Sequence, residues 1–145
     1  MKKILLSLLA AIGLSTTGCS AQASQSAPSD SYAKSAPSDG IIVFAPQAFI
    51  NQAKADTTSI LLDVRTSKEY AEGHLAGAQQ LDYLNPEAFD AGLSKLDKSH
   101  TYYIYCRSGK RSHGACLKMK KQGFKVYDME GGILNWIKLG MPIEK

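Results

Sequence analysis

Short apolar runs alternate with amphipathic stretches over roughly the last two thirds of the chain. Runs of four or five apolar, aromatic or β-branched residues are typical of strands buried in a parallel sheet. The pattern predicts strands at residues 41–44, 60–64, 101–105 and 126–129, with a weaker candidate at residues 78–81.

Helix signals fill the intervals between these runs. Asn85 is a capping residue, and it is followed by a proline and an acidic residue, which favour the first turn of a helix. The stretch at residues 112–122 places Ala115, Cys116 and Met119 on one face and is followed by Gly123, a typical stop. Helices are expected at residues 46–55, 67–72, 86–93, 112–122 and 133–139.

Strands that alternate with helices predict an α/β domain with a parallel sheet, which we place at residues 41–145. Ligands of such sheets bind beyond the carboxyl ends of the strands. The composition, with 44% apolar and 21% charged residues, agrees with one globular domain.

The N-terminal part of the chain has a different pattern. Lys2 and Lys3 precede an apolar run at residues 4–14. This run is too short to span a bilayer, which takes about 20 residues, but it suits the core of a secretory signal. We therefore expect a signal peptide at residues 1–18 and export of the protein to the cell envelope or periplasm.

The sequence TTGCS at residues 16–20 resembles the lipobox of bacterial lipoproteins, although Thr16 replaces the usual leucine. In that family the cysteine, here Cys19, is lipidated and becomes the mature N-terminus, which would anchor the protein to a membrane. Ordinary signal cleavage after Ala23 and an uncleaved N-terminal anchor are the alternatives.

A segment rich in Ser, Ala and Pro follows at residues 19–40, and the sequence SAPSD occurs in it twice. Large apolar residues are too few there to offset the entropy of ordering the chain. The segment is predicted to be a disordered tether between anchor and domain.

Charge and cysteine content narrow the function. Without Lys2 and Lys3 the net charge falls from +4 to about +2, which gives no reason to expect nucleic-acid binding. Residues 107–125 nevertheless hold seven Lys or Arg and no Asp or Glu, which indicates a local anion site. If Cys19 carries lipid, only Cys106 and Cys116 remain, too few for a disulfide framework.

The stretch TYYIYCRSGKRS at residues 101–112 carries the candidate chemistry. A strand ends in Cys106, and a basic loop then leads into a helix. The thiolate is the reactive form of cysteine, and cationic neighbours and a helix N-terminus both favour it. The predicted sulfur- and anion-binding loop consists of Arg107, Ser108, Gly109, Lys110, Arg111 and Ser112.

Three separated segments resemble the single-domain rhodanese (thiosulfate sulfurtransferase) family. They are LLDVRTSKEYAEGHLAGA at residues 61–78, YCRSGKRS at residues 105–112, and GFKVYDMEGGILNWIKLGMPI at residues 123–143. The resemblance implies a three-layer fold with a five-stranded parallel sheet flanked by helices. It also implies that Cys106 is the catalytic residue, which takes sulfur as a persulfide from a thiosulfate-like anion and passes it to cyanide or a thiol.

The same resemblance suggests roles for charged residues. Arg111, together with Lys110, is expected to recognise the sulfonate end of the donor. Arg107 is expected to form an ion pair with Asp63 that braces the loop. Asp63, Arg65 and Glu69 are interpreted as a supporting ion-pair network.

Loop length separates sulfur from phosphate chemistry. Phosphatases of similar fold have five residues between cysteine and arginine, whereas four residues separate Cys106 from Arg111. The shorter loop favours sulfur over phosphate. Two alternatives remain: a module that carries sulfur or docks a partner without turnover, and a phosphatase or arsenate reductase.

No cofactor or metal is predicted, because Cys106, His113 and Cys116 have no suitably spaced fourth ligand. Cys116 is interpreted as a small core residue, with a resolving thiol as the alternative.

Overall fold

The computed structural model describes residues 33–34 and 38–145. The predicted signal peptide, Cys19 and most of the predicted tether lie outside the described residues. All helices and strands predicted for residues 41–145 lie within the described residues.

The strands form a single sheet. They are β1 (Ala33–Lys34), β2 (Val43–Phe44), β3 (Ser59–Asp63), β4 (Gln79–Gln80), β5 (Thr101–Tyr105) and β6 (Lys125–Met129). Their order across the sheet is β1-β2-β6-β5-β3-β4. The last five in this order are parallel to one another, as predicted, and β1 joins the edge by antiparallel pairing with β2.

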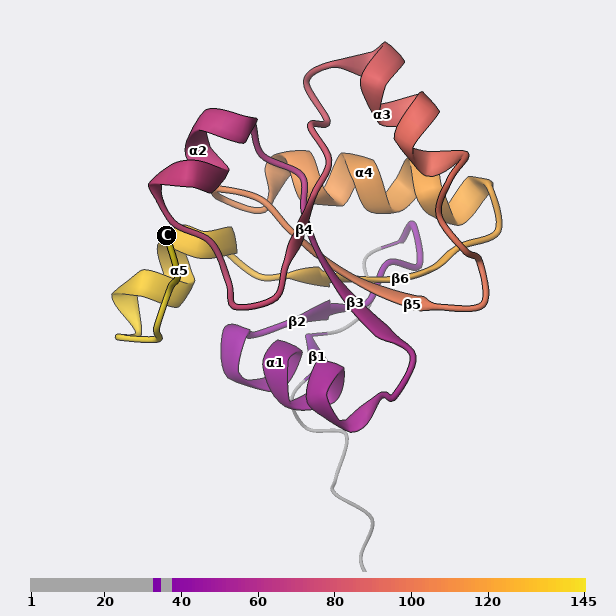
Figure 1. Ribbon diagram of the computed structural model, residues 1–145. Helices are drawn as coiled ribbons and strands as arrows, with labels where there is room; N and C mark the ends of the chain where they lie inside the picture. Colours follow the sequence, from indigo (N-terminus) through magenta and orange to yellow (C-terminus); the bar gives the residue numbers. More distant parts are fainter. Residues whose placement is uncertain (1–32, 35–37) are drawn as a thin grey trace, which may run out of the picture.

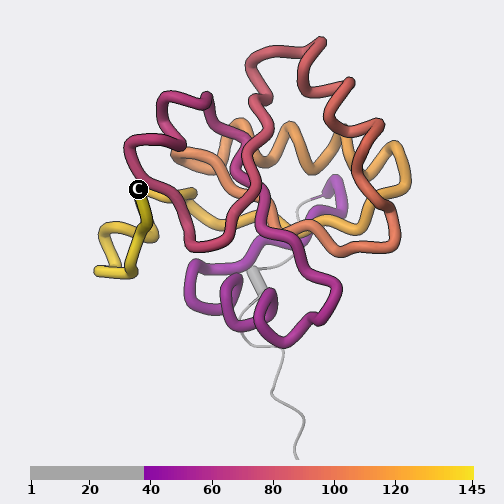
Figure 2. Tube along the Cα trace, in the orientation of Figure 1, coloured from indigo at the N-terminus to yellow at the C-terminus, as the bar shows by residue number. Residues whose placement is uncertain are grey.

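Helices cover both faces of the sheet. They are α1 (Pro46–Ala55), α2 (Ser67–Glu72), α3 (Pro86–Leu93), α4 (Lys110–Lys121) and α5 (Gly132–Lys138). In Figure 1, α3 and α4 lie over one face and α1 lies on the other. The trace in Figure 2 ends close to the segment that contains α2, where Glu144 pairs with His74 through two backbone hydrogen bonds of 2.8 Å. The predicted three-layer α/β fold is confirmed.

Alternation along β5 divides the core between the two faces. Tyr102 and Ile104 pack with side chains from α3 and α4, whereas Tyr103 and Tyr105 pack with side chains from α1 and α5. All five residues of β5 are buried, as expected for the central strand of a covered parallel sheet.

Most element boundaries agree with the sequence patterns, and the differences have local causes. Helix α4 begins at Lys110 instead of residue 112, because Gly109 takes a left-handed conformation with φ of 97° and ends the loop there. Ala33 and Lys34, which lie in the predicted tether, form β1 on the open edge of β2. Among the described residues, no helix is long and apolar enough to cross a membrane.

Candidate active site

Cys106 lies directly after β5, at the carboxyl edge of the parallel sheet. The residue is fully buried, and its Sγ accepts a hydrogen bond of 3.1 Å from the backbone N–H of Gly109. The predicted location beyond the strand ends is therefore where the structure places the cysteine. This geometry holds the sulfur against the first turn of α4, whose unpaired amides carry partial positive charge.

The loop after Cys106 is short and exposes two of its three cations to solvent. Arg107, Ser108 and Lys110 are exposed, and Gly109 and Arg111 are half-buried. Ser112 is buried, and its hydroxyl donates to the carbonyl of Gly109 at 3.2 Å. The six predicted loop residues thus form a single turn of backbone next to the Cys106 sulfur.

The N-terminus of α5 fixes the other side of the loop. The N–H of Ile133 donates to the carbonyl of Cys106 at 2.9 Å, and the N–H of Leu134 donates to the carbonyl of Arg107 at 3.1 Å. Gly132 has φ of 59°, and a Cβ there would collide with the carbonyl oxygen of Cys106 and lie 2.6 Å from that of Arg107. Sequence reasoning missed this role of Gly132, although the paired glycines before a helix were a visible signal.

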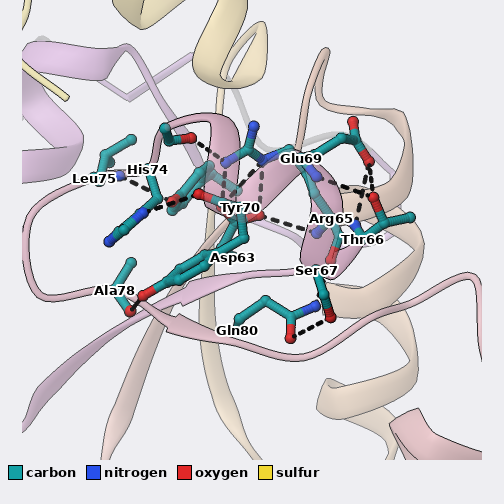
Figure 3. A network of polar contacts seen from close by, with 12 residues as sticks. Asp63, Arg65, Thr66, Ser67, Glu69, Tyr70, His74, Leu75, Ala78 and Gln80 are labelled. Carbon is teal, nitrogen blue, oxygen red and sulfur yellow. Dashed lines mark hydrogen bonds and ion pairs between the residues drawn. The ribbon is translucent and has the colours of Figure 1, made fainter. Parts of the chain in front are cut away.

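The expected ion pair between Asp63 and Arg107 is wrong, because Asp63 pairs with Arg65. Arg65 Nε donates to the two carboxylate oxygens at 2.9 and 3.0 Å, and its Nη2 donates to Oδ2 at 2.5 Å and to the carbonyl of Gly73 at 2.8 Å. Figure 3 shows this network beside α2, and both side chains are buried. Arg65, only two residues away in the chain, folds back into the core and contacts both carboxylate oxygens of Asp63. Arg107 is instead exposed at the surface.

Arg111 forms a bidentate ion pair with Glu69 of α2, with N–O distances of 2.7 and 2.8 Å. The hydrogen bond from Arg111, followed by those from Thr66, lowers the pKa of Glu69 to about 2. The Glu69 carboxylate likewise raises the pKa of Arg111. The supporting network predicted for Asp63, Arg65 and Glu69 is therefore two separate pairs, and the cation expected to meet the sulfonate is held by a carboxylate.

Cys116 occupies a core position. It is fully buried on α4 in the same apolar cluster as Cys106, and both cysteines are free thiols. Burial raises the pKa of the Cys116 thiol well above its usual range. Its surroundings agree with the interpretation as a small packing residue.

Sequence reasoning also missed a buried carboxylate behind the loop. Asp128, near the end of β6, is 2% exposed, and its Oδ2 lies 3.5 Å from Nδ1 of His113. The other ring nitrogen of His113 lies 2.7 Å from Oδ2 of Asp39. Burial raises the pKa of Asp128 to about 6, although contacts with Ser112 and His113 oppose this effect. A polar residue at the end of an apolar strand was the only local signal.

A cavity of about 190 Å³ opens beside the loop, between α2 and α5. Arg65, Glu69, Glu72 and Arg107 contribute its charged lining. Among the described residues, no group of three or more His, Cys, Asp and Glu side chains is arranged to hold a metal ion.

This arrangement of sheet, helices and cysteine loop agrees with a family match. The model of the family described as "Rhodanese-like domain" matches residues 46–139, which make up more than half of the chain. The chain belongs to the rhodanese-like domain family.

Several relatives are named as sulfurtransferases. A "Sulfurtransferase" from Allochromatium vinosum is 40% identical over 97 residues, which cover 65% of this chain and 87% of the relative. The "Putative sulfurtransferase YtwF" of Bacillus subtilis is 37% identical over 89 residues, covering 61% of this chain and 84% of that protein. The relatives support assignment to the sulfurtransferase class.

Solved structures support the fold. A rhodanese-related protein from Thermoplasma volcanium matches with a TM-score of 0.63 and 24% identity, covering 70% of this chain and 96% of that one. The rhodanese-like domain of an Anabaena protein matches with a TM-score of 0.57 and 27% identity, covering 68% of this chain and 74% of that one.

Proposed function

We propose that this protein moves a sulfane sulfur from an anionic donor, such as thiosulfate, to a thiophilic acceptor through a persulfide on Cys106. The observation that carries the proposal is the position of Cys106, at the carboxyl end of β5 with the Gly109 amide donating to its sulfur. A thiolate at this position is stabilised by the amide and by the start of α4, and it is the nucleophilic form.

The proposed reaction has two displacement steps. The Cys106 thiolate attacks the outer sulfur of thiosulfate, the sulfur–sulfur bond of the donor breaks, and sulfite leaves with the bonding electron pair. The enzyme then carries the extra sulfur as a persulfide anion. Cyanide or a thiolate attacks this outer sulfur, takes it as thiocyanate or a persulfide, and restores the Cys106 thiolate.

The loop supports both steps electrostatically. Its backbone amides stabilise the negative sulfur, as oxyanion-hole donors stabilise developing charge. The exposed side chains of Arg107 and Lys110 attract the anionic donor. Arg111 is held in one orientation by its ion pair with Glu69, whose negative charge offsets that of the guanidinium.

A pair of cysteine variants tests the proposal. Cys106→Ser should abolish thiocyanate formation from thiosulfate and cyanide, whereas Cys116→Ala should retain it because Cys116 is a packing residue. An equal rate for wild type and Cys106→Ser would refute catalysis by Cys106. Persulfide formation without turnover would instead identify a sulfur carrier. Hydrolysis of aryl phosphates or reduction of arsenate, without sulfur transfer, would favour the phosphatase or arsenate reductase alternative.

We further propose that the protein is exported and anchored by lipid on Cys19. The support is the apolar run at residues 4–14 followed by the sequence resembling a lipobox. Cys19→Ala should move the protein from the membrane fraction to the soluble fraction of cells that express the full chain. Retention of the variant in the membrane fraction would exclude lipid as the anchor.

A further inference from the structure

Glu69 is held in place from two directions. Its Oε2 accepts hydrogen bonds from the backbone N–H and the hydroxyl of Thr66, at 3.2 and 3.0 Å, in the capping box that begins α2. Both of its oxygens also accept from Arg111. Figure 3 shows how Thr66 and Glu69 meet at the start of α2. The carboxylate is therefore a fixed negative charge beside the cysteine loop.

The negative charge of Glu69 lowers the net positive charge that the loop offers to an anionic donor. The loop carries the cations Arg107, Lys110 and Arg111, but the negative charge of Glu69 offsets that of Arg111. Two loop cations, both exposed, remain to balance the Cys106 thiolate and the donor together. Thiosulfate brings two negative charges, so thiolate and donor carry one charge more than these two cations compensate. A donor with a single negative charge matches them.

The cavity beside the loop has a second selective property. One wall is aliphatic and consists of Ile133, Leu134, Ile137 and Ile143, and Glu72 adds a second carboxylate to Glu69. Leu134 and Ile137 are each 48% exposed, so their apolar surface faces solvent when the cavity is empty. The cavity adjoins the loop directly, because the N–H of Leu134 donates to the carbonyl of Arg107. An apolar group bound there would remove this surface from water.

We propose that Glu69 determines donor specificity, so that the protein prefers organic sulfane-sulfur donors with one negative charge and an apolar group over inorganic thiosulfate. The inference rests on the sulfur transfer proposed above. Glu69 and the aliphatic wall act on different parts of the donor: the carboxylate disfavours a second negative charge, and the wall binds the organic group.

An organic thiosulfonate, R–SO2–S⁻, is the simplest probe of this class. The Cys106 thiolate attacks its outer sulfur, the sulfur–sulfur bond breaks, and the sulfinate R–SO2⁻ leaves with the electron pair. The products are the same persulfide anion and one singly charged leaving group. Charge and atoms balance without any oxidant or reductant.

The wild-type protein is tested first with thiosulfate, methanethiosulfonate and benzenethiosulfonate, with cyanide as acceptor. Each kcat/KM is divided by the rate constant of the uncatalysed reaction of the same donor with cyanide, which removes differences in intrinsic reactivity. We expect the normalised value to be about tenfold higher for benzenethiosulfonate than for methanethiosulfonate, and lowest for thiosulfate. A highest value for thiosulfate would overturn the inference.

The variant Glu69→Gln tests the charge directly. Removing the carboxylate should raise kcat/KM for thiosulfate about five- to tenfold, mainly through a lower KM, and should change the value for methanethiosulfonate much less. Glu87→Gln is the matched control, because Glu87 is an exposed residue in the first turn of α3 and does not line the cavity. An equal fall for all donors in Glu69→Gln would show a structural role alone and would contradict the proposal.

The variant Ile137→Asn tests the aliphatic wall at a position that is 48% exposed. It should lower the ratio of kcat/KM for benzenethiosulfonate to that for methanethiosulfonate about fivefold. An unchanged ratio would overturn this part of the inference. Failure of the sulfur-transfer proposal would give a different result, because Cys106→Ser would then form thiocyanate at the wild-type rate with every donor.

Discussion

Cys106 is positioned by backbone atoms of its neighbours. Gly109 donates its N–H to the sulfur, while Ile133 donates to the carbonyl of Cys106 itself. These two contacts come from the starts of α4 and α5, so two helix N-termini converge on the cysteine loop. Gly132 allows this approach because a Cβ there would collide with the backbone of Cys106 and Arg107, whereas Gly109 supplies a left-handed φ of 97°.

Gly132→Ala should therefore damage both stability and sulfur transfer. The left-handed φ costs about 1–2 kcal/mol for an L-residue, and the new Cβ also collides with the backbone of Cys106 and Arg107. Gly123→Ala is a matched control, because Gly123 has φ of 88° but nothing within 4 Å of its added Cβ. Urea denaturation and the thiocyanate assay should show a larger loss for position 132; equal losses would contradict the close approach.

Asp128 should make stability depend on pH between about pH 4 and about pH 6. Its pKa is raised from 3.8 to about 6 in the folded state, so the folded protein binds the proton more tightly than the unfolded chain. The stabilising effect of this proton is complete below about pH 4 and is lost as the pH rises to about 6.

Asp128→Asn cannot titrate and isolates this effect. The free energy of unfolding of the variant minus that of wild type should rise between pH 4 and pH 7, by at most about 3 kcal/mol. Urea denaturation at several pH values measures the difference. A difference that stays constant or falls over this interval would exclude a raised pKa for Asp128.

At the level of single residues, the sequence predicted what is local. Cys106 and its loop follow from consecutive residues that end a strand and begin a helix. The predicted partner of Asp63 was wrong because two arginines, Arg65 and Arg107, are within reach of it in the predicted fold. The sequence does not indicate which of the two is buried. The Arg111–Glu69 pair joins residues 42 positions apart, so it depends on the packing of α2 beside α4.

The helices and strands were more predictable than the contacts between them. The boundaries of α1, α2, α3 and β5 agree with the prediction, because each has a local signal such as Pro46, Gly73 or Asn85. The earlier start of α4 depends on the left-handed conformation of Gly109, which the residue type permits but does not require. Strand β1 lies in a segment without apolar runs, so no pattern indicated it.

The C-terminal residues 141–145 should stabilise the domain although they form no helix. Glu144 exchanges two backbone hydrogen bonds with His74, and Trp136 Nε1 donates to the carbonyl of Pro142 at 2.9 Å. Truncation after Gly140 should lower the free energy of unfolding by about 2–4 kcal/mol, at roughly 1 kcal/mol for each hydrogen bond plus lost packing. Deletion of Lys145 alone is the control, and an equal effect of the two deletions would contradict the role of these contacts.

At the scale of the whole molecule, the parallel sheet explains why the site forms where it does. Strands β3, β5 and β6 end at one edge and place Asp63, Cys106 and the two glycines at the start of α5 in the same region. Apolar clusters pack against both faces of the sheet. The α/β pattern was sufficient to predict that the candidate residues lie at this edge, whereas the order of the strands was not predicted.

The proposed function depends on the transfer of a single sulfur atom from the donor to Cys106. Intact mass spectrometry of the purified protein after treatment with thiosulfate measures this step directly. We expect a mass gain of one sulfur atom that maps to Cys106, disappears on addition of cyanide and is absent in Cys106→Ser. An unchanged mass, or a gain that persists in Cys106→Ser, would contradict it.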